Sequence, residues 1–445
     1  MIIVVGAGPA GLAAAKSAAK HGMAVTVIDS QPRGGGQYWR HLAEVSGYKS
    51  GRSAIYLQEL RDNPLITHLS GAQVWSAEKL ADGYQLNYLQ DGVEKKIQGQ
   101  KLIIATGAYD RTLPFPGWTS SGVMTPGGAQ ALLKGHNVLA GKTVVVSGTG
   151  PFLLPVATAL ASKGALVEII EAHNPLRWAL SPVALILNPG KFFELMYYMR
   201  AIMLLKIKIT FGCAVTNFEG GEVQISKVHS DLSIKRKNVR TIASEVLATG
   251  WGFLPDVTLG GILGCSQTLD RDETVVFEVD GEQRASARNI WIAGEATGVG
   301  GADLAIIEGG IAGLSAAGAK IPQILKWKRL AKRIFARALQ RSYPVGNGWQ
   351  QWLRDDTIIC RCEEVSRREI VESVQSLGAE DARTSKLFTR AGMGLCQGRV
   401  CSRNVSDLVA CSTKCAVSPN ERIAASNRPI AAPIALGVLS DGNAG

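Results

Sequence analysis

One sequence unit occurs twice in this chain, and the duplication limits the folds that the chain can adopt. Residues 6–9 (GAGP) align with residues 148–151 (GTGP), and residues 25–29 align with residues 167–171. Each copy has a short apolar strand, a glycine-rich turn, an alanine-rich helix and a second apolar strand that ends in an acidic residue. This is the pattern of a βαβ nucleotide-binding unit, so we expect an α/β fold with two nested dinucleotide-binding units.

The first copy carries the residues that a dinucleotide site needs. Gly6 permits the tight turn, Gly8 lets a pyrophosphate approach the backbone, and Gly11 lets the helix pack closely on the strand. The N-terminus of the helix then meets the phosphate charge. Asp29 follows the second strand, where such units place an acid that accepts hydrogen bonds from the adenosine ribose. We therefore predict a dinucleotide site that includes Gly6, Gly8, Pro9, Ala10, Gly11, Asp29 and Ser30.

The second copy departs from this pattern at the start of its helix. Leu153 stands where the third glycine is expected, and Pro155 follows two residues later. A leucine here pushes the helix away from the strand, so the second unit either binds a nucleotide in an altered geometry or is a remnant that binds none. We favour impaired NAD(P) binding. The acid of this copy, Glu171, would repel a 2′-phosphate, which disfavours NADP.

Length and composition indicate two or three packed domains. The chain has 445 residues, of which 46% are apolar and 19% are charged. No basic leader accompanies Met1, and the longest apolar run is interrupted by Pro182 and ends at Pro189, so we expect no signal peptide and no spanning helix. The net charge of +11 does not distinguish between nucleic acid, anionic lipid and an acidic partner. We expect a cytoplasmic protein without a nucleic-acid partner, and contact with a membrane surface stays open.

Much of the positive charge lies between residues 321 and 341. Seven lysine and arginine residues alternate there with apolar residues, and this stretch contains no acidic residue. The pattern predicts a basic amphipathic helix, which either lies on a membrane surface or a partner protein, or packs on its own domain as a connecting helix. We favour the connecting helix.

The two nested units resemble the two-dinucleotide-binding flavoproteins, a superfamily that includes the pyridine nucleotide-disulfide reductases. The resemblance covers residues 1 to about 318 and implies two Rossmann-like units, of which the first binds FAD. It also implies that residues 34–37 offer backbone amides to the pyrophosphate and that residues 104–107 pass close to the flavin.

The same resemblance extends to a later strand and turn. Residues 290–295 match the element whose acid binds the FAD ribityl chain, although Glu295 stands where the family usually has aspartate. The helix that follows residues 300–303 would point its N-terminus at the flavin ring and stabilise negative charge there. The further residues implied for FAD are Gly35, Gly36, Gln37, Ala105, Thr106, Gly107, Gly294, Glu295, Gly301 and Ala302.

Disulfide reductases of this superfamily need two neighbouring cysteines beside the flavin. Before residue 360 the chain has only Cys213 and Cys265, which lie far apart in the sequence and which we interpret as small buried residues. We therefore do not expect disulfide reduction.

Four later cysteines form a C-x-C pair and a C-x4-C pair, namely Cys360, Cys362, Cys396 and Cys401. Such thiolates bind either zinc, which prefers C-x2-C pairs, or an iron–sulfur cluster, which needs loops with free backbone amides. Several glycines around the second pair favour the cluster. The arrangement resembles the bacterioferritin-associated-ferredoxin (BFD) type of 2Fe-2S domain, which implies these four cysteines as ligands. We interpret Cys411 and Cys415 as non-ligands.

The order of these parts resembles one class of subunit over nearly the whole chain. It is that of the FAD and 2Fe-2S subunits of opine, D-hydroxyproline and dye-linked proline dehydrogenases and of hydrogen cyanide synthase. This resemblance implies a hetero-oligomer with a D-amino-acid-oxidase-like (DAO-like) catalytic subunit, and in some relatives a small ferredoxin-like 2Fe-2S subunit. Some relatives also bind FMN at a subunit interface and ATP in the second unit.

On this interpretation the chain carries no catalytic residue of its own. His41, His136 and His173 lie near glycine or proline, and we interpret them as surface or loop residues. A self-sufficient NAD(P)H-dependent FAD and 2Fe-2S oxidoreductase is the alternative function, and a scaffold with vestigial sites is a third.

The motifs together divide the chain into five segments. We assign residues 1–112 and 286–320 to an FAD-binding domain, 113–285 to the second nucleotide-binding domain, 321–354 to a basic linker helix, 355–416 to the BFD-like domain and 417–445 to a tail.

Overall fold

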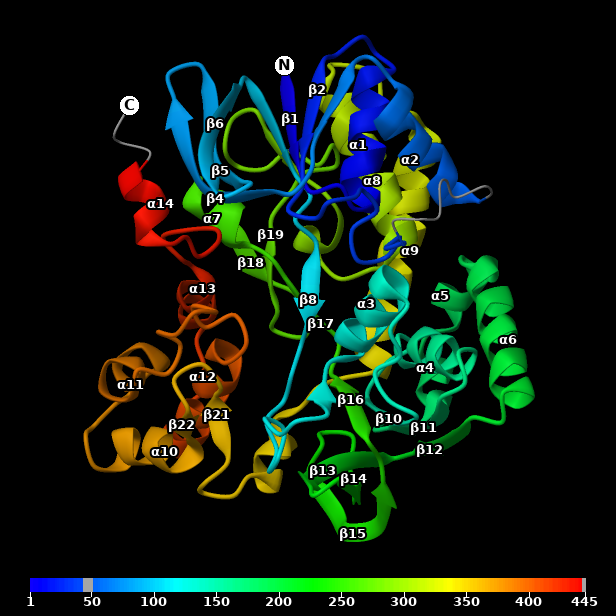
Figure 1. Ribbon diagram of the computed structural model, residues 1–445, viewed down its shortest axis with the longest axis vertical. Helices are drawn as coiled ribbons and strands as arrows, with labels where there is room; N and C mark the ends of the chain where they lie inside the picture. Colours follow the sequence, from blue (N-terminus) through cyan, green and yellow to red (C-terminus); the bar gives the residue numbers. More distant parts are fainter. Residues whose placement is uncertain (43–50, 442–445) are drawn as a thin grey trace.

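The computed structural model describes residues 1–42 and 51–441, and it confirms the predicted α/β architecture with a small C-terminal domain. The first nucleotide unit forms one end of the molecule. The second nucleotide unit and the cysteine-bearing domain lie side by side at the other end (Figure 1).

Five parallel strands form the central sheet of the first unit, in the order β20-β7-β1-β2-β3. Strands such as β1 and β2 are buried along their whole length, because helices and a second sheet cover both faces and only apolar residues fit there. The strands are β1 (Ile2–Val5), β2 (Val25–Ile28), β3 (Ile66–Leu69), β7 (Lys101–Ile104) and β20 (Ile290–Ile292), and the helices are α1 (Pro9–Ala19), α2 (Arg52–Asp62) and α8 (Ala302–Ala316).

Helices α1 and α8 pack at very short range. A Cβ atom added at Gly309 would lie 2.0 Å from the carbonyl oxygen of Ala10, and one added at Gly313 would lie 2.2 Å from that of Ala14. The alanine and glycine residues of the two helices therefore set their separation, and this contact fixes the start of α8 against the first glycine turn.

Residues that follow the second unit in sequence return to the core of the first. Val257 and Phe277 belong to the same buried cluster as Ile3 and Ile28. The predicted boundary at residue 285 is therefore wrong, because the first unit resumes at about Val257. The elements involved are the antiparallel strands β4 (Ala72–Leu80), β5 (Gly83–Gln90) and β6 (Val93–Gly99), helix α7 (Thr258–Ile262), and strands β18 (Gln267–Leu269) and β19 (Val275–Phe277).

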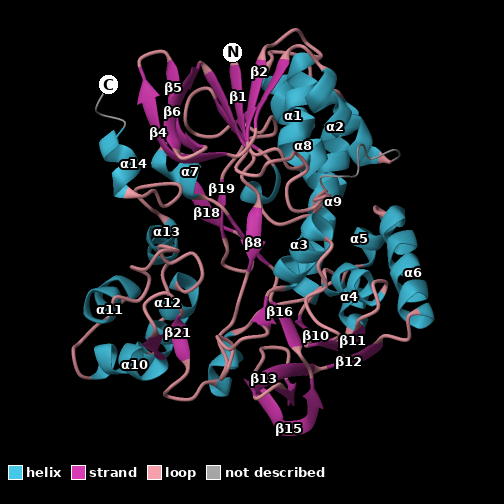
Figure 2. Ribbon diagram, in the orientation of Figure 1, coloured by secondary structure: helices cyan, strands magenta, loops and turns pink. Residues whose placement is uncertain are grey.

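The second unit repeats the plan of the first with the parallel order β12-β11-β10-β16-β9. Its strands are β9 (Val123–Met124), β10 (Thr143–Gly148), β11 (Leu166–Glu171), β12 (Lys208–Phe211) and β16 (Val246–Gly250), beside the antiparallel β13 (Cys213–Glu219), β14 (Glu222–Val228) and β15 (Ile234–Ala243). Its helices are α3 (Pro126–His136), α4 (Leu153–Ala161), η1 (Pro175–Leu180), α5 (Pro182–Ile186) and α6 (Pro189–Leu204). Strands β8 (Ala108–Asp110) and β17 (Phe253–Pro255) pair where the chain passes between the two units (Figure 2).

The predicted basic helix is α9 (Gln323–Ser342), and it packs on the first unit. Its Arg329 and Arg333 pair with the buried Glu308 of α8, and Lys332 pairs with Asp303. The helix thus packs on the protein itself, as the favoured alternative predicts, and it also contacts α5 of the second unit, while Trp327 and Leu330 stay exposed. Across the described residues, each helix lacks the combined length and hydrophobicity that crossing a bilayer requires.

The cysteine-bearing domain shares a core with the second unit. Cys360, Cys401 and Val405 belong to one buried cluster with Trp118 and Trp251. The domain contains η3 (Asn347–Trp352), β21 (Ile358–Cys360), β22 (Val365–Ser366), α10 (Arg367–Gln375), α11 (Ala382–Thr389) and α12 (Ser402–Thr413). The predicted tail adds α13 (Pro419–Ser426), which packs against α12, and α14 (Leu436–Asp441).

Candidate functional site

The first glycine turn has the backbone geometry that a bound pyrophosphate requires. Gly6 has a φ of +103°, and a Cβ atom added there would lie 2.3 Å from the carbonyl oxygen of Ala105. A Cβ atom at Gly11 would lie 1.8 Å from the carbonyl oxygen of Gly6, so α1 approaches β1 this closely only with glycine. Gly8 is the N-cap of α1, and no described side chain caps this helix end. The positive end of the helix dipole is thus free to meet a phosphate.

The loop after β2 closes over this turn. Asp29 accepts a hydrogen bond of 2.5 Å from the backbone N–H of Ala7, and Gly35 donates its own N–H to the Ala7 carbonyl at 2.8 Å. A Cβ atom at Gly36 would lie 2.9 Å from Cα of Gly8, so only glycine lets the two loops meet. This exposed backbone fits the pyrophosphate of FAD. The other predicted residues of this region, Pro9, Ala10, Ser30 and Gln37, lie on the same turn and loop.

The segment 104–107, which we predict to pass close to the flavin, runs beside this turn. Strand β7 pairs with β1 in the sheet, which brings Ala105 to Gly6. The hydroxyl of Thr106 donates to the carbonyl of Asp256 at 2.8 Å, and the N–H of Asp256 donates to the carbonyl of Gly107 at 3.0 Å. These bonds fix the segment against the strand that returns from the second unit.

The predicted acid, Glu295, faces the start of α8. Its carboxylate accepts hydrogen bonds from the N–H groups of Gly300 (3.2 Å) and Gly301 (2.8 Å), just before Ala302 begins the helix. Burial raises the pKa of Glu295 to about 7, so this carboxyl changes its charge near neutral pH. Gly294, with a φ of +81°, lies against the first turn of α1. The contact of Glu295 with the ribityl chain stays a prediction.

A second acid on α8, Glu308, has no counterpart among the predicted residues. Its side chain is fully buried and accepts hydrogen bonds from the N–H of Gly294 (3.2 Å) and the hydroxyl of Thr297 (3.0 Å). Arg333 and Arg329 of α9 neutralise it, at 2.6 and 3.2 Å. Glu308 thus joins the turn before α8 to the basic helix. A lone glutamate within an apolar helix, followed by a run of arginines, was the signal in the sequence for this pairing.

The second unit starts its helix later than the first. Helix α1 begins at Pro9, directly after Gly8, whereas the aligned Pro151 precedes α4, which begins at Leu153. Leu153 is buried in the core between α4 and β10. Leu153 therefore begins a helix whose end is displaced from the glycine turn, and impaired nucleotide binding stays a prediction.

The acid of the second unit, Glu171, is engaged in hydrogen bonds within the protein. Glu171 is 6% exposed and accepts hydrogen bonds from the Thr149 hydroxyl (2.8 Å) and from the N–H groups of Gly150 (2.9 Å) and His173 (3.0 Å). His173 also bonds Thr149 and the carbonyl of Ser230. As predicted, His173 lies in a loop, between β11 and η1, but it is 2% exposed and completes this network instead of lying at the surface. Of the other two histidines, His136 ends α3 and His41 bonds the carbonyl of Trp39.

The four predicted ligand cysteines come together as two pairs. A hydrogen bond from Cys401 lowers the pKa of Cys360 to about 5, and the thiols of Cys362 and Cys396 bond each other. The N–H of Gly392 also donates to Sγ of Cys360 at 3.4 Å. Two thiolate pairs suit the two irons of a 2Fe-2S cluster. In residues 1–42 and 51–441, no three Cys, His, Asp or Glu side chains converge as a single zinc ion requires.

Glycines make room for the cysteine loops. A Cβ atom at Gly394 would lie 2.3 Å from Cβ of Cys362, and Gly398 has a φ of +77°. A larger residue at either position would displace the loop that carries Cys396. Cys411 and Cys415 are exposed at and beyond the end of α12.

Two arginines that the motifs did not identify hold this loop in place. Arg399 donates to the carbonyls of Cys396 (3.3 Å) and Ala431 (2.5 Å), and Arg428 donates to the carbonyl of Gln397 (2.7 Å). Ala431 in turn donates its N–H to a carbonyl of β4 at 2.7 Å. The segment 427–432, predicted as a tail, therefore ties the cysteine loop to the first unit.

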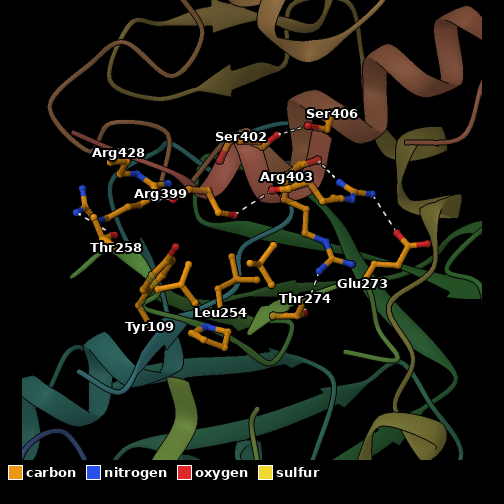
Figure 3. A pocket seen from close by; sticks show the side chains of 16 residues that line it. Tyr109, Leu254, Thr258, Glu273, Thr274, Arg399, Ser402, Arg403, Ser406 and Arg428 are labelled. Carbon is orange, nitrogen blue, oxygen red and sulfur yellow. Dashed lines mark hydrogen bonds and ion pairs between the residues drawn. The ribbon is translucent and has the colours of Figure 1, made fainter. Parts of the chain in front are cut away.

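A cavity of about 50 Å³ lies where the cysteine-bearing domain meets the first unit (Figure 3). Arg403 donates to the hydroxyl of Thr274 at 3.0 Å, and Arg422 pairs with Glu273 at 3.1 Å. Burial raises the pKa of Tyr109 to about 12, so its phenol stays protonated at neutral pH. The arginines thus have partners across the junction, and we interpret the cavity as part of a fixed contact between domains.

Comparison with known proteins supports both cofactor sites. The family described as pyridine nucleotide-disulphide oxidoreductase matches residues 1–313, and the BFD-like [2Fe-2S] binding domain matches residues 358–410. These two families imply FAD and a 2Fe-2S cluster. The chain is also similar to the crystal structure of L-proline dehydrogenase from P. horikoshii, with a TM-score of 0.66 and 18% identity. The match covers 98% of this chain and 78% of that one. That likeness concerns the fold alone.

Two relatives are similar over most of their length. The HcnB component of hydrogen cyanide synthase from Pseudomonas protegens is 31% identical, and the alignment covers 91% of this chain and 91% of that protein. One of the opine oxidase subunits of Rhizobium meliloti is 30% identical, with 94% of this chain and 83% of that protein covered. The resemblance inferred from the motifs is confirmed, and the names of these relatives, as parts of larger enzymes, indicate a hetero-oligomer.

Proposed function

Because the chain belongs to the pyridine nucleotide-disulphide oxidoreductase family and carries a BFD-like [2Fe-2S] domain, we propose that it is an electron-transfer subunit of a heteromeric dehydrogenase. The partner subunit oxidises an amino acid, an imino acid or an opine, and this chain receives the electrons. FAD supplies a carrier of two electrons and the cluster a carrier of one. The chain's own residues bind these groups and fix them relative to each other.

The observation that carries this proposal is the contrast between the two nucleotide units. The first has a glycine turn with a free helix end, whereas in the second the helix begins late, at Leu153. A nicotinamide cofactor therefore lacks the usual site from which it reduces the flavin. Electrons must then enter from another polypeptide, in keeping with relatives that are subunits of an opine oxidase and a hydrogen cyanide synthase.

The junction between the domains supports transfer between the two cofactors. Arg399 and Arg403, on either side of Cys401, bond Thr258 and Thr274 of the first unit. The loop that carries the cluster ligands is thus held directly on the flavin-binding unit. A fixed separation favours electron transfer without movement of a domain.

The partners follow from the same reasoning. We propose a DAO-like flavoprotein as the catalytic partner, because this chain has no predicted catalytic residue of its own. A small ferredoxin-like subunit, FMN at a subunit interface, an adenine nucleotide in the second unit and contact with a membrane stay predictions.

Purification of the tagged chain from its own cells tests the proposal. We expect one flavoprotein to co-purify in a fixed ratio, identified by mass spectrometry, and each copy of this chain to hold one FAD and two irons. An amine substrate should bleach the flavin of the complex. Rapid bleaching of the isolated chain by NADH would instead favour the self-sufficient NAD(P)H oxidoreductase, and a colourless chain would favour the scaffold.

A further inference from the structure

Helix α6 (Pro189–Leu204) has almost no partner within the described part of the chain. Of its 16 residues only Ile202 is buried. Phe193 is 71% exposed, Tyr197 69% and Met203 69%. The neighbouring α5 adds Val183 and Ile186, which are also exposed. Together with the exposed Leu204, we call Val183, Ile186, Phe193, Tyr197 and Met203 the α5–α6 face. Figure 1 places α6 at the outer edge of the molecule, with α5 on its inner side.

The apolar composition of α6 does not suit a helix that is exposed to water. Apolar residues occupy all its sides, and helices with this pattern are normally buried in protein or in a membrane. At about 1.5 Å per residue it is near 24 Å long, too short for the roughly 30 Å of a hydrocarbon core, and it carries Lys191, Glu194 and Arg200. A helix that lies on a membrane surface has a strongly polar side, which α6 lacks. Another protein surface is therefore the environment that suits it.

The α5–α6 face adjoins the flavin end of the first unit. Lys191, in the first turn of α6, lies 3.8 Å from a carboxylate oxygen of Asp303. Asp303 belongs to the first turn of α8, and Arg52 and Lys332 also pair with it. Helix α6 is thus linked to the helix whose N-terminus, by resemblance, points at the flavin ring.

We propose that the α5–α6 face is the docking surface for the catalytic partner. This inference rests on the proposed function, and it adds where the partner binds. Aromatic residues and methionine, which form much of this face, are enriched in protein interfaces. A partner seated here covers the apolar helix and lies next to the end of the first unit where the flavin is expected. The docking surface and the entry point for electrons then coincide.

Hydrogen exchange on the purified complex tests the location. We expect the amides of α5 and α6 to exchange more slowly in the complex than in the isolated chain, while those of α11 stay unchanged. The double variant Phe193→Glu/Met203→Glu should bind the partner at least about thirty-fold more weakly, as expected for central interface residues. Its flavin and iron content should not change, because both side chains are exposed.

A matched variant controls for added charge. Leu387 and Phe388 of α11 are also exposed, at 67% and 49%, so Leu387→Glu/Phe388→Glu should keep the partner. Unchanged exchange in α6 together with normal binding by the Phe193/Met203 variant would overturn the inference. Binding of the isolated chain to phosphatidylglycerol vesicles, or its dimerisation, would also overturn it if the same variant abolished either. If the wild-type chain brings down no catalytic partner, the proposed function fails, which is a different result.

Discussion

At the scale of single residues, the cysteines separate the two cofactors. Cys360 and Cys401 lie in the core shared with the second unit, whereas the glycine turn of Gly6 and Gly8 lies on the first unit. These two cysteines and Ala7 of the glycine turn belong to different buried clusters. A substitution at the iron–sulfur site should therefore leave the flavin site intact, and the reverse should also hold.

Cys396→Ser should therefore remove the cluster and keep FAD. Serine is a poor ligand for iron compared with a thiolate, and Cys396 pairs with Cys362 in the ligand set. Iron analysis and the visible spectrum measure the loss, and flavin released on denaturation measures what is retained. Cys411→Ser is the control, because this exposed thiol lies outside the two pairs. Simultaneous loss of FAD and iron would contradict this separation.

Glu295 should give the protein a pH dependence near neutrality. Burial raises the pKa of Glu295 to about 7. The folded chain therefore keeps the Glu295 proton at pH values where the unfolded chain has already lost it. Its contribution to stability is therefore fully present below the ordinary carboxyl range and is lost as the pH rises to about 7. Glu295→Gln lacks this change, so its melting temperature relative to wild type should rise by a few degrees between pH 5 and pH 8. A constant difference would refute the assignment.

Single residues also mark the limit of prediction from sequence. Gly6, Gly8 and Gly11 were identified because backbone geometry at a glycine turn depends on local sequence. Glu308 was missed, since its arginine partners come from another helix and no local pattern records a buried ion pair. The burial of the loop residue His173 was not foreseen for the same reason, as its neighbours Thr149 and Ser230 are distant in sequence.

At the scale of elements, α4 and α6 differ from their expected behaviour in opposite ways. Helix α4 packs well but begins late, with Leu153 in the place of a glycine, which is why we predict impaired nucleotide binding. Helix α6 keeps helical structure with hardly any packing. The repeat in the sequence predicted the first of these features. It did not predict the second, because α6 precedes β12 as α2 precedes β3, and its place in the repeat does not show what packs on the helix.

Leu153→Ala should destabilise the protein without creating an NADH site. Leu153 is 2% exposed within the α4 core, and truncation of a buried leucine costs about 2–5 kcal/mol of unfolding free energy. Chemical denaturation with two probes measures this change. The late helix start and the occupied Glu171 remain, so flavin reduction by NADH should stay as slow as in wild type. A large gain in NADH reactivity would show that the leucine alone blocks the site.

At the scale of the whole molecule, the C-terminal segment joins regions that the sequence placed far apart. Arg422 is 5% exposed and pairs with Asp407 of α12, while Arg428 holds the cysteine loop and Ala431 reaches β4. The segment was assigned to a tail because the sequence motifs end before it, and motifs give no sign of such long-range contacts. The return of residues from about Val257 to the first unit escaped prediction for the same reason.

Removal of residues 418–445 should release the cluster before the flavin. The truncated chain loses Arg428 from the loop at Gln397 and exposes the buried Asp407, whereas the glycine turn of the first unit keeps its contacts. We expect iron to be lost within hours in air, measured by absorbance, with FAD still bound. The milder variant Arg428→Ala should show the same order of loss more slowly. Equal loss of both cofactors would mean that the segment supports the entire fold.

The common core of the cysteine-bearing domain and the second unit gives the second unit a structural role that does not depend on a bound nucleotide. Trp118 and Trp251 of that fold form a wall behind Cys360 and Cys401, and the indole of Trp118 donates to the carbonyl of Ile358 at 2.6 Å. The second unit thus packs against the cysteine-bearing domain and keeps Cys360 and Cys401 away from water. The second unit and the cysteine-bearing domain then depend on each other for stability. Mutations that destabilise the second unit should therefore first cause oxidative loss of the iron–sulfur cluster.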